Sequence, residues 1–141
     1  MSLPTTEEII DDISFFDDWE DKYKYIIDLG KSLPEFDDAW RTPERLVKGC
    51  QSNVWIQPGA TQDPVKGEVL TFSVDSDAVI VRGLLGVVMA AYNERTPAEI
   101  IGFDIDKYFS ELDLESHLSP TRGNGLRSIV GRVQAIAKAS V

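Results

Sequence analysis

Residues 77–92 form the most apolar stretch of the chain and constrain the fold more than any other segment. Val79, Ile80, Leu84 and Val87 recur at helical spacing, and the apolar residues between them widen the stripe to most of the circumference. A helix that is apolar on most sides is buried, whereas a surface helix keeps one polar face. We therefore expect the remaining elements to pack around a central helix over these residues.

Two glycines lie inside this expected helix, Gly83 and Gly86. Each lowers helix propensity by up to about 1 kcal/mol relative to alanine. We expect close packing of these positions against a sheet to compensate for that cost. The polar residues just before the helix, Asp75-Ser76-Asp77, are candidates for its N-cap, since Asp and Ser side chains accept hydrogen bonds from the first helical N–H groups.

The other expected helices have recognisable start signals or apolar periodicity. The cap candidates are Thr5 with Glu8, Asp17 or Asp18, Thr96 with Glu99, and Asp104. The corresponding helices are expected over residues 6–16, 18–31, 97–102 and 105–112, followed by an amphipathic C-terminal helix over residues 126–137. We interpret the aromatic pair Trp19 and Tyr23 as core packing.

Alternating apolar residues predict a few short strands in the middle of the chain. We expect a strand over residues 54–57, a loop over 58–64, a second strand over 65–70 and a third over 71–74. The alternation leaves open whether residues 65–74 form one strand or two. The expected fold is α+β, with a small antiparallel sheet and helices packed on it. The 141 residues show no internal linker and fit one domain over residues 1–141.

The charge of the chain excludes some classes of partner. The sequence has 24 acidic and 14 basic residues, which gives a formal charge of −10. Such a surface repels a nucleic-acid backbone and lacks the basic clusters that anionic membranes attract. The acidic surface could dock onto a basic patch of another protein, or it could simply keep the protein in solution.

The termini and the apolar runs carry no targeting or membrane signal. No basic segment followed by an apolar run begins the chain, and the longest apolar stretch, residues 83–91, is far shorter than the ~20 residues that span a bilayer. The expected location is cytoplasmic. There a single cysteine, Cys50, stays reduced and cannot form an intramolecular disulfide. One thiol is also too few for a typical structural zinc or iron–sulfur site, so we expect no cofactor in this chain.

Cys50 has neighbours typical of an exposed loop. Gly49 allows a sharp backbone turn, and the polar residues 51–53 favour a loop before the apolar alternation begins. A free cysteine is often a buried hydrophobe, and this setting argues against that interpretation without excluding it. Arg45 and Lys48 are close in sequence, and a nearby cation favours the nucleophilic thiolate.

Three stretches of the sequence resemble the SufE family and its close relative CsdE. They are Gly49-Cys50-Gln51-Ser52-x-Val54-Trp55, residues 75–84 (DSDAVIVRGL) and residues 117–126 (HLSPTRGNGL). The resemblance extends from about residue 19 to the C-terminal helix. It implies an α+β fold of the SufE/IscU-like type.

The resemblance also implies a function. Members of the family accept sulfur from the persulfide of a cysteine desulfurase, stimulate that enzyme and deliver the sulfur for iron–sulfur cluster assembly. In this sequence Cys50 matches the sulfur-accepting cysteine, and Gly49, Gln51 and Ser52 match its loop. Displacement at sulfur by a thiolate needs a thiol that can reach a partner's active site, which a loop provides.

Two more residues in the matching stretches are candidate supporting residues. Arg122 is expected near the cysteine loop or the partner surface by resemblance, and its alternative is an exposed charge at a helix start. Asp75 is a cap candidate, and the resemblance adds a role in holding the cysteine loop in its resting position.

The expected partners follow from the same resemblance. They are a cysteine desulfurase, which would hold its own pyridoxal phosphate (PLP), and an iron–sulfur scaffold or another sulfur-accepting protein. The chain has no second cysteine, so sulfur must leave Cys50 for another molecule. The sequence leaves open whether the chain forms a homodimer.

Two other functions are compatible with the residues. A binding module could activate a desulfurase with Cys50 incidental. A cysteine hydrolase would need an imidazole base, for which His117 is the only candidate. No local cysteine-protease signature surrounds Cys50, and we interpret His117 as a residue at the entry of a helix.

Overall fold

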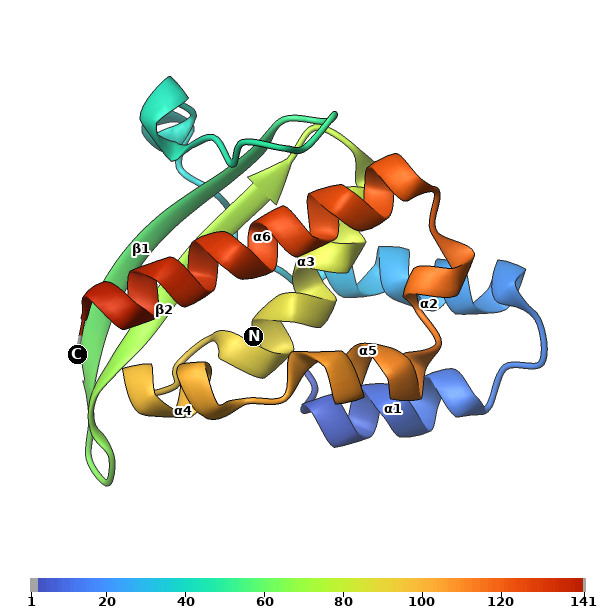
Figure 1. Cartoon of the computed structure of the whole chain (residues 1–141), viewed down its shortest axis with the longest axis horizontal. Coiled ribbons are helices and arrows are strands. Elements are labelled where there is room, and N and C mark those ends of the chain that lie inside the picture. The colour runs from blue at the N-terminus through green and yellow to red at the C-terminus, as the bar shows by residue number, and fades with distance from the viewer. Residues whose placement is uncertain (1–2, 141) are drawn as a thin grey trace.

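Helix α3 (Val79–Tyr92) lies at the centre of the computed structural model, which describes residues 3–140 (Figure 1). Every residue from Val81 to Tyr92 except Arg82 is buried. The prediction of a central buried helix is therefore confirmed. Its N-cap is Ala78, whose N–H donates to the Ser76 hydroxyl at 3.2 Å. The expected cap by a side chain of residues 75–77 is wrong, because residues 75 and 76 end a strand.

Helix α2 (Trp19–Lys31) packs closely on α3, and glycines permit the contact. A Cβ added at Gly83 would lie 2.5 Å from the Ile26 carbonyl oxygen, and one added at Gly30 would lie 2.8 Å from the Gly83 nitrogen. At Gly86 an added Cβ would lie 3.1 Å from the Cβ of Leu29. The expected compensation for Gly83 and Gly86 does occur, but it comes from a neighbouring helix and not from a sheet.

Strands β1 (Val54–Asp63) and β2 (Gly67–Ser76) form one long antiparallel hairpin, with Val54 opposite Ser76 and Asp63 opposite Gly67. Both strands are ten residues long, and they make the only sheet in residues 3–140. The α+β class is confirmed. The predicted loop over residues 58–64 is wrong, and the region that the sequence left open as one strand or two forms a single strand.

Local chemistry explains why the strands continue through the expected loop. The Asp63 carboxylate accepts hydrogen bonds from the N–H groups of Val65 and Lys66 at 2.8 and 2.9 Å, and Gly67 has a φ of +85°, so the chain turns within three residues. Pro58 has the same parity as Val54, whose carbonyl bonds Val47 on the outer edge of β1. The missing N–H of Pro58 therefore faces away from β2, where proline is tolerated.

The remaining helices surround α3. They are α1 (Thr6–Ser14), α4 (Pro97–Gly102), α5 (Ile105–Leu112) and α6 (Pro120–Ala139), with short 3₁₀ turns η1 (Asp38–Trp40), η2 (Pro43–Arg45) and η3 (Glu115–His117). The predicted capping boxes at α1 and α4 are both present, and Asp18 and Asp104 cap α2 and α5 as expected. None of the helices within residues 3–140 is long and apolar enough to cross a membrane.

Helix α6 runs across the front of the molecule in Figure 1 and begins six residues earlier than predicted. Ser119 caps it by accepting a hydrogen bond from the Arg122 N–H at 3.2 Å, and Pro120 occupies the first helical position. The glycines at 123 and 125 conceal this first part in the sequence, because they lower its helix propensity. The extra turns bring residues 119–125 to the cysteine loop.

We predict that Gly83→Ala destabilises the fold by about 1–3 kcal/mol, because the new methyl group would force α2 and α3 apart. Gly131→Ala in α6 is the matched control. Nothing lies within 4 Å of a Cβ there, so the control should gain up to about 1 kcal/mol from helix propensity. Urea unfolding of both variants measures the difference. Equal or greater stability of Gly83→Ala would contradict the close helix contact.

Candidate functional site

Residues 48–53, here called the cysteine loop, connect two backbone segments that are hydrogen-bonded to each other. The Val47 N–H donates to the Val54 carbonyl at 2.8 Å, and Leu46 pairs with Trp55 in an antiparallel bridge. These contacts extend the outer edge of β1. The two ends of the loop are therefore held side by side, and the six residues between them project from the hairpin.

The C-terminal end of the loop is fixed by the residues that follow β2. The Asn53 N–H donates to the Asp77 carboxylate at 3.1 Å, and the Asn53 carbonyl accepts from the Ser76 hydroxyl at 2.7 Å and from the Asp77 N–H at 3.3 Å. Sequence reasoning missed both residues because it assigned the acidic stretch to a helix cap. The second matching motif, which contains them, was the available signal.

Gly49 turns the chain in a way that only glycine allows easily. Its φ is +93°, and an added Cβ would overlap the Ser128 hydroxyl of α6. Gly125, one turn earlier in α6, lies against the next residue of the loop, and a Cβ there would be 3.5 Å from the Cys50 sulfur. The loop thus packs directly onto a flat, small-residue face of α6.

The Cys50 thiol points inward and is partly buried. It donates a weak hydrogen bond to the Gly125 carbonyl at 3.4 Å, and burial raises the pKa of this thiol above its ordinary value. In this conformation burial outweighs the effect of the cations that the sequence predicts to favour the thiolate. The guanidinium of Arg45 donates instead to the side chains of Gln57 and Thr42.

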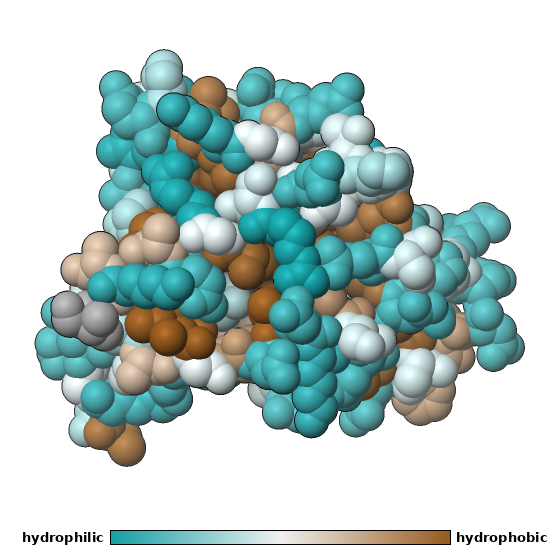
Figure 2. All heavy atoms as spheres, viewed as in Figure 1, coloured by the Kyte–Doolittle hydropathy of each residue, from teal (hydrophilic) through white to brown (hydrophobic). Residues whose placement is uncertain are grey.

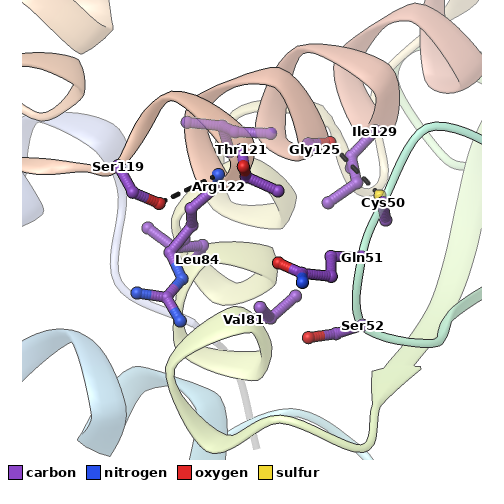
Figure 3. Close-up of a pocket in the computed structure, with 11 residues that line it drawn as sticks. Cys50, Gln51, Ser52, Val81, Leu84, Ser119, Thr121, Arg122, Gly125 and Ile129 are labelled. Atoms are coloured by element: carbon purple, nitrogen blue, oxygen red, sulfur yellow. Dashed lines mark hydrogen bonds between the residues drawn. The ribbon is translucent and has the colours of Figure 1, made fainter.

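A cavity of about 50 Å³ lies beneath the thiol (Figure 3). Three elements line it: the cysteine loop, α3 and α6. Its apolar lining consists of Val81, Leu84, Leu126 and Ile129. Gln51, Ser52 and Arg122 also line it, so these expected residues share one site with Cys50. A water needs about 10–15 Å³ of such space, so the cavity has room for an atom bonded to the sulfur.

Arg122 and Cys50 lie on opposite sides of this cavity in Figure 3, and the Gln51 amide points into it from the loop. Arg122 is exposed and forms no ion pair with any residue in the range 3–140. The structure therefore puts a free positive charge at the edge of the thiol site, where the sequence left its position open.

Asp75 does not contact the cysteine loop. It is buried in β2, where its carboxylate forms ion pairs with Arg41 at 2.5 Å and Arg82 at 2.8 Å. Arg82 also donates to the Ser76 carbonyl at 3.2 Å. The resemblance assigned Asp75 a role in holding the loop, but the structure shows no hydrogen bond or ion pair from its side chain to residues 48–53, because the strand alternation directs it to the face opposite Val74. The residues of this stretch that bond the loop are Ser76 and Asp77.

His117 lies outside the cavity and does not form a dyad with Cys50. Its ring stacks on Trp19 with centroids 3.9 Å apart, and the Tyr23 hydroxyl donates to its carbonyl. Trp19 and Tyr23 therefore pack against the η3 turn that leads into α6. The hydrolase hypothesis lacks its base in this arrangement. Within residues 3–140, no group of three His, Cys, Asp or Glu side chains could hold a metal ion.

The raised pKa predicts the pH profile of thiol alkylation. We expect the rate with neutral iodoacetamide to reach half its maximum at a pH above that of a free cysteine, about 8.5. The same reaction in urea-unfolded protein should show the ordinary midpoint, since burial is lost. A folded-state midpoint below the unfolded one would mean that cations stabilise the thiolate at rest.

We also predict that Gly49→Ala destabilises the fold by about 1–3 kcal/mol through backbone strain and the overlap with Ser128. Gly67→Ala is the control for strain alone, because Gly67 also has positive φ but nothing lies within 4 Å of its added Cβ. Gly49→Ala should cost more than the control, and adding Ser128→Ala should recover part of the difference. Equal costs in urea unfolding would contradict the packing of the loop on α6.

Comparison with known proteins gives one consistent family. The family model of SufE, described as the Fe–S metabolism associated domain, matches residues 7–137. A SufE-like protein of Rhizobium etli, itself described as uncharacterized, is 46% identical over 138 residues, covering 98% of this chain and 93% of that protein. A second, from Rhizobium meliloti, is 43% identical over 136 residues and covers 96% of each.

A solved structure has the same fold. The solution structure of a hypothetical protein from Thermus thermophilus aligns with a TM-score of 0.73 at 16% identity, covering 99% of this chain and 97% of that one. With the family match over residues 7–137 and two relatives above 40% identity, the resemblance read from the three motifs is confirmed. The chain belongs to the SufE family and is thereby associated with iron–sulfur metabolism.

Proposed function

We propose that this protein is a sulfur carrier that accepts sulfur on Cys50 from a cysteine desulfurase, stimulates that enzyme and delivers the sulfur for iron–sulfur cluster assembly. The observation that carries the proposal is the placement of the single thiol on a projecting loop, beside a small cavity that apolar side chains of α3 and α6 line on one side. The pyridoxal phosphate belongs to the partner, and its chemistry releases sulfur from cysteine as a persulfide on the desulfurase.

The transfer step exchanges one sulfur–sulfur bond for another. The Cys50 thiolate attacks the terminal sulfur of the donor's persulfide, a Cys50 persulfide forms, and the donor cysteine leaves as a thiolate. The number of sulfur–sulfur bonds is unchanged, so the step needs no external oxidant or reductant. The proton lost from Cys50 is available to the leaving thiolate.

The resting geometry supports a loop that opens. Among the described residues, the only hydrogen bond from residues 48–52 to α3 or α6 is the weak one from the Cys50 thiol to Gly125. The base of the loop, in contrast, is fixed at Val47 and Asn53. Opening would therefore rotate the tip about a fixed base and expose the thiol, and exposure would bring its pKa back toward the ordinary value.

The cavity fits the product of the transfer. A persulfide adds one sulfur atom beyond the Cys50 sulfur, and the space beneath that sulfur is lined by Val81, Leu84, Leu126 and Ile129. A reclosed loop would place this atom against these side chains and limit its contact with thiols that could reduce it. Delivery would require a second opening, toward an iron–sulfur scaffold or another sulfur-accepting protein in the cytoplasm.

The test is desulfurase turnover with Cys50→Ser. We expect the variant to give no stimulation above the desulfurase alone, because a hydroxyl is a far poorer nucleophile toward sulfur. Because position 50 is partly buried, we expect the variant to have a lower free energy of unfolding than the wild type. The loss should lie between the roughly ±0.5 kcal/mol of a surface substitution and the roughly 1–3 kcal/mol of a buried hydroxyl without a partner.

A double variant controls for the position of the thiol. Cys50→Ser with Thr61→Cys moves the only cysteine to the exposed part of β1, and it should also fail to stimulate. Full stimulation by Cys50→Ser alone would overturn the carrier mechanism and favour the rival function, a module that activates the desulfurase by binding.

A further inference from the structure

The charge of the chain is divided unevenly, and the surface around Cys50 has the sign opposite to that of the whole molecule. Residues 1–40 contain twelve acidic and three basic residues. Residues 120–141 contain four basic residues and no acidic one, although the formal charge of the chain is −10. The net charge is therefore a poor guide to the surface that a partner meets at the thiol.

Three cations flank the thiol, and we call them the basic rim: Lys48, Arg122 and Arg132. Lys48 is exposed in the cysteine loop, and Arg122 lines the Cys50 cavity. Arg132 donates to the carbonyls of Glu44 and Leu46 at 3.2 and 3.3 Å, just before the loop. Arg122 and Arg132 are ten residues apart on α6, about 15 Å along the helix. The rim thus extends along one side of the thiol site.

The rim is not neutralised by ion pairs. Within residues 3–140, none of its three members forms an ion pair with a carboxylate. Arg127, which lies between two of them in sequence, shows the contrast, since it pairs with Asp106 at 2.6 Å and Glu115 at 2.5 Å. The acidic residues beside the loop are Glu44 and Asp77, and Arg45 adds a further cation. The local balance is positive.

One group of acidic residues lies on helices that contribute nothing to the Cys50 cavity. Seven of the 24 lie on α1 and α2, which occupy the right of Figure 1, whereas the N-terminal half of α6 and the start of β1 lie above them. At physiological ionic strength the Debye length is about 8 Å, so charges well beyond this distance contribute little at the thiol. The α6 face itself shows hydrophobic residues only as small, separate patches (Figure 2).

We propose that the basic rim docks the sulfur donor, and that the matching surface of the donor is acidic. The proposal rests on the proposed function and names the chemistry of the partner's surface. It reverses the expectation drawn from net charge alone, in which an acidic surface of this protein would meet a basic patch. The acidic surface on α1 and α2 would be repelled by an acidic donor, which favours encounters in which the thiol faces the donor.

The field at the thiol can be tested without any partner. Cys50 is treated with two disulfides of similar length, the dianion 3,3′-dithiodipropionate and the dication cystamine. The rate of each disulfide with Cys50 is divided by the rate of the same disulfide with the neutral thiol N-acetylcysteine amide, and the preference is the quotient for the dianion divided by the quotient for the dication. The Cys50 thiolate forms a mixed disulfide and releases a thiolate in both reactions, so the thiolate fraction cancels in the ratio. We expect a several-fold preference for the dianion at about 0.02 M salt that approaches unity at about 1 M, since the Debye length falls to about 3 Å.

Matched charge variants assign that preference. Lys48→Glu should lower it, whereas Lys24→Glu makes the same charge change at an exposed position of α2, which contributes no residue to the Cys50 cavity, and should leave it unchanged. A preference for cystamine in the wild type, or equal effects of the two variants, would overturn the basic rim.

The partner's charge is tested with a PLP-containing cysteine desulfurase and L-cysteine. Lys48→Glu should raise the concentration of this protein that gives half-maximal stimulation several-fold, with the maximal rate unchanged, and Lys24→Glu should not. Unchanged or tighter half-saturation for Lys48→Glu overturns the acidic docking surface alone and leaves the carrier function standing. Absence of stimulation by the wild type overturns the proposed function and this inference together, whatever the disulfide ratio.

Discussion

The position of the thiol depends on the pairing of Val47 with Val54, which joins the two ends of the cysteine loop. This pairing continues the edge of β1, so the base of the loop is attached directly to a hairpin whose strands are each ten residues long. Ser76 and Asp77, the residues at and after the end of β2, then fix Asn53. Because the base is held by four hydrogen bonds, a movement of the tip need not disturb the sheet.

The resting conformation makes Cys50 a poor nucleophile. Burial raises its pKa, and its thiol donates to a carbonyl of α6 and is not held by a cation. A carrier benefits from this arrangement, since a thiol that reacts freely would be oxidised or would lose its sulfur before reaching a partner. Under the proposed function, activation would occur at the encounter, when the tip opens, the burial of the thiol is lost and its pKa falls toward the ordinary value.

The sequence predicted those parts of the structure in which local chemistry decides. Capping boxes at Thr5 and Thr96 and the apolar pattern of α3 identified helices correctly, because their signals lie within a few residues of each helix. The motif around Cys50 was sufficient to find the family. The hairpin was missed because Pro58 and Gly59 normally favour a loop, and only the position of β1 at the edge of the sheet makes them acceptable.

Contacts between distant segments could not be predicted in this way. Several contacts join residues whose spacing in the chain carries no signal. They are the packing of Gly83 on Ile26, the ion pairs of Asp75 with Arg41 and Arg82, and the approach of Gly125 to Cys50. For the same reason, the sequence could not show that Arg45, although close to Cys50 in the chain, is directed to Gln57. Burial by α6 decides the state of the thiol.

The most direct measurement of the carrier function is the mass of the peptide that contains Cys50, after incubation with desulfurase and L-cysteine and separation without reductant. We expect a gain of one sulfur atom on Cys50 that disappears on treatment with a thiol reductant. An unmodified Cys50 peptide, recovered while the desulfurase is stimulated and carries its own persulfide, would contradict the carrier function.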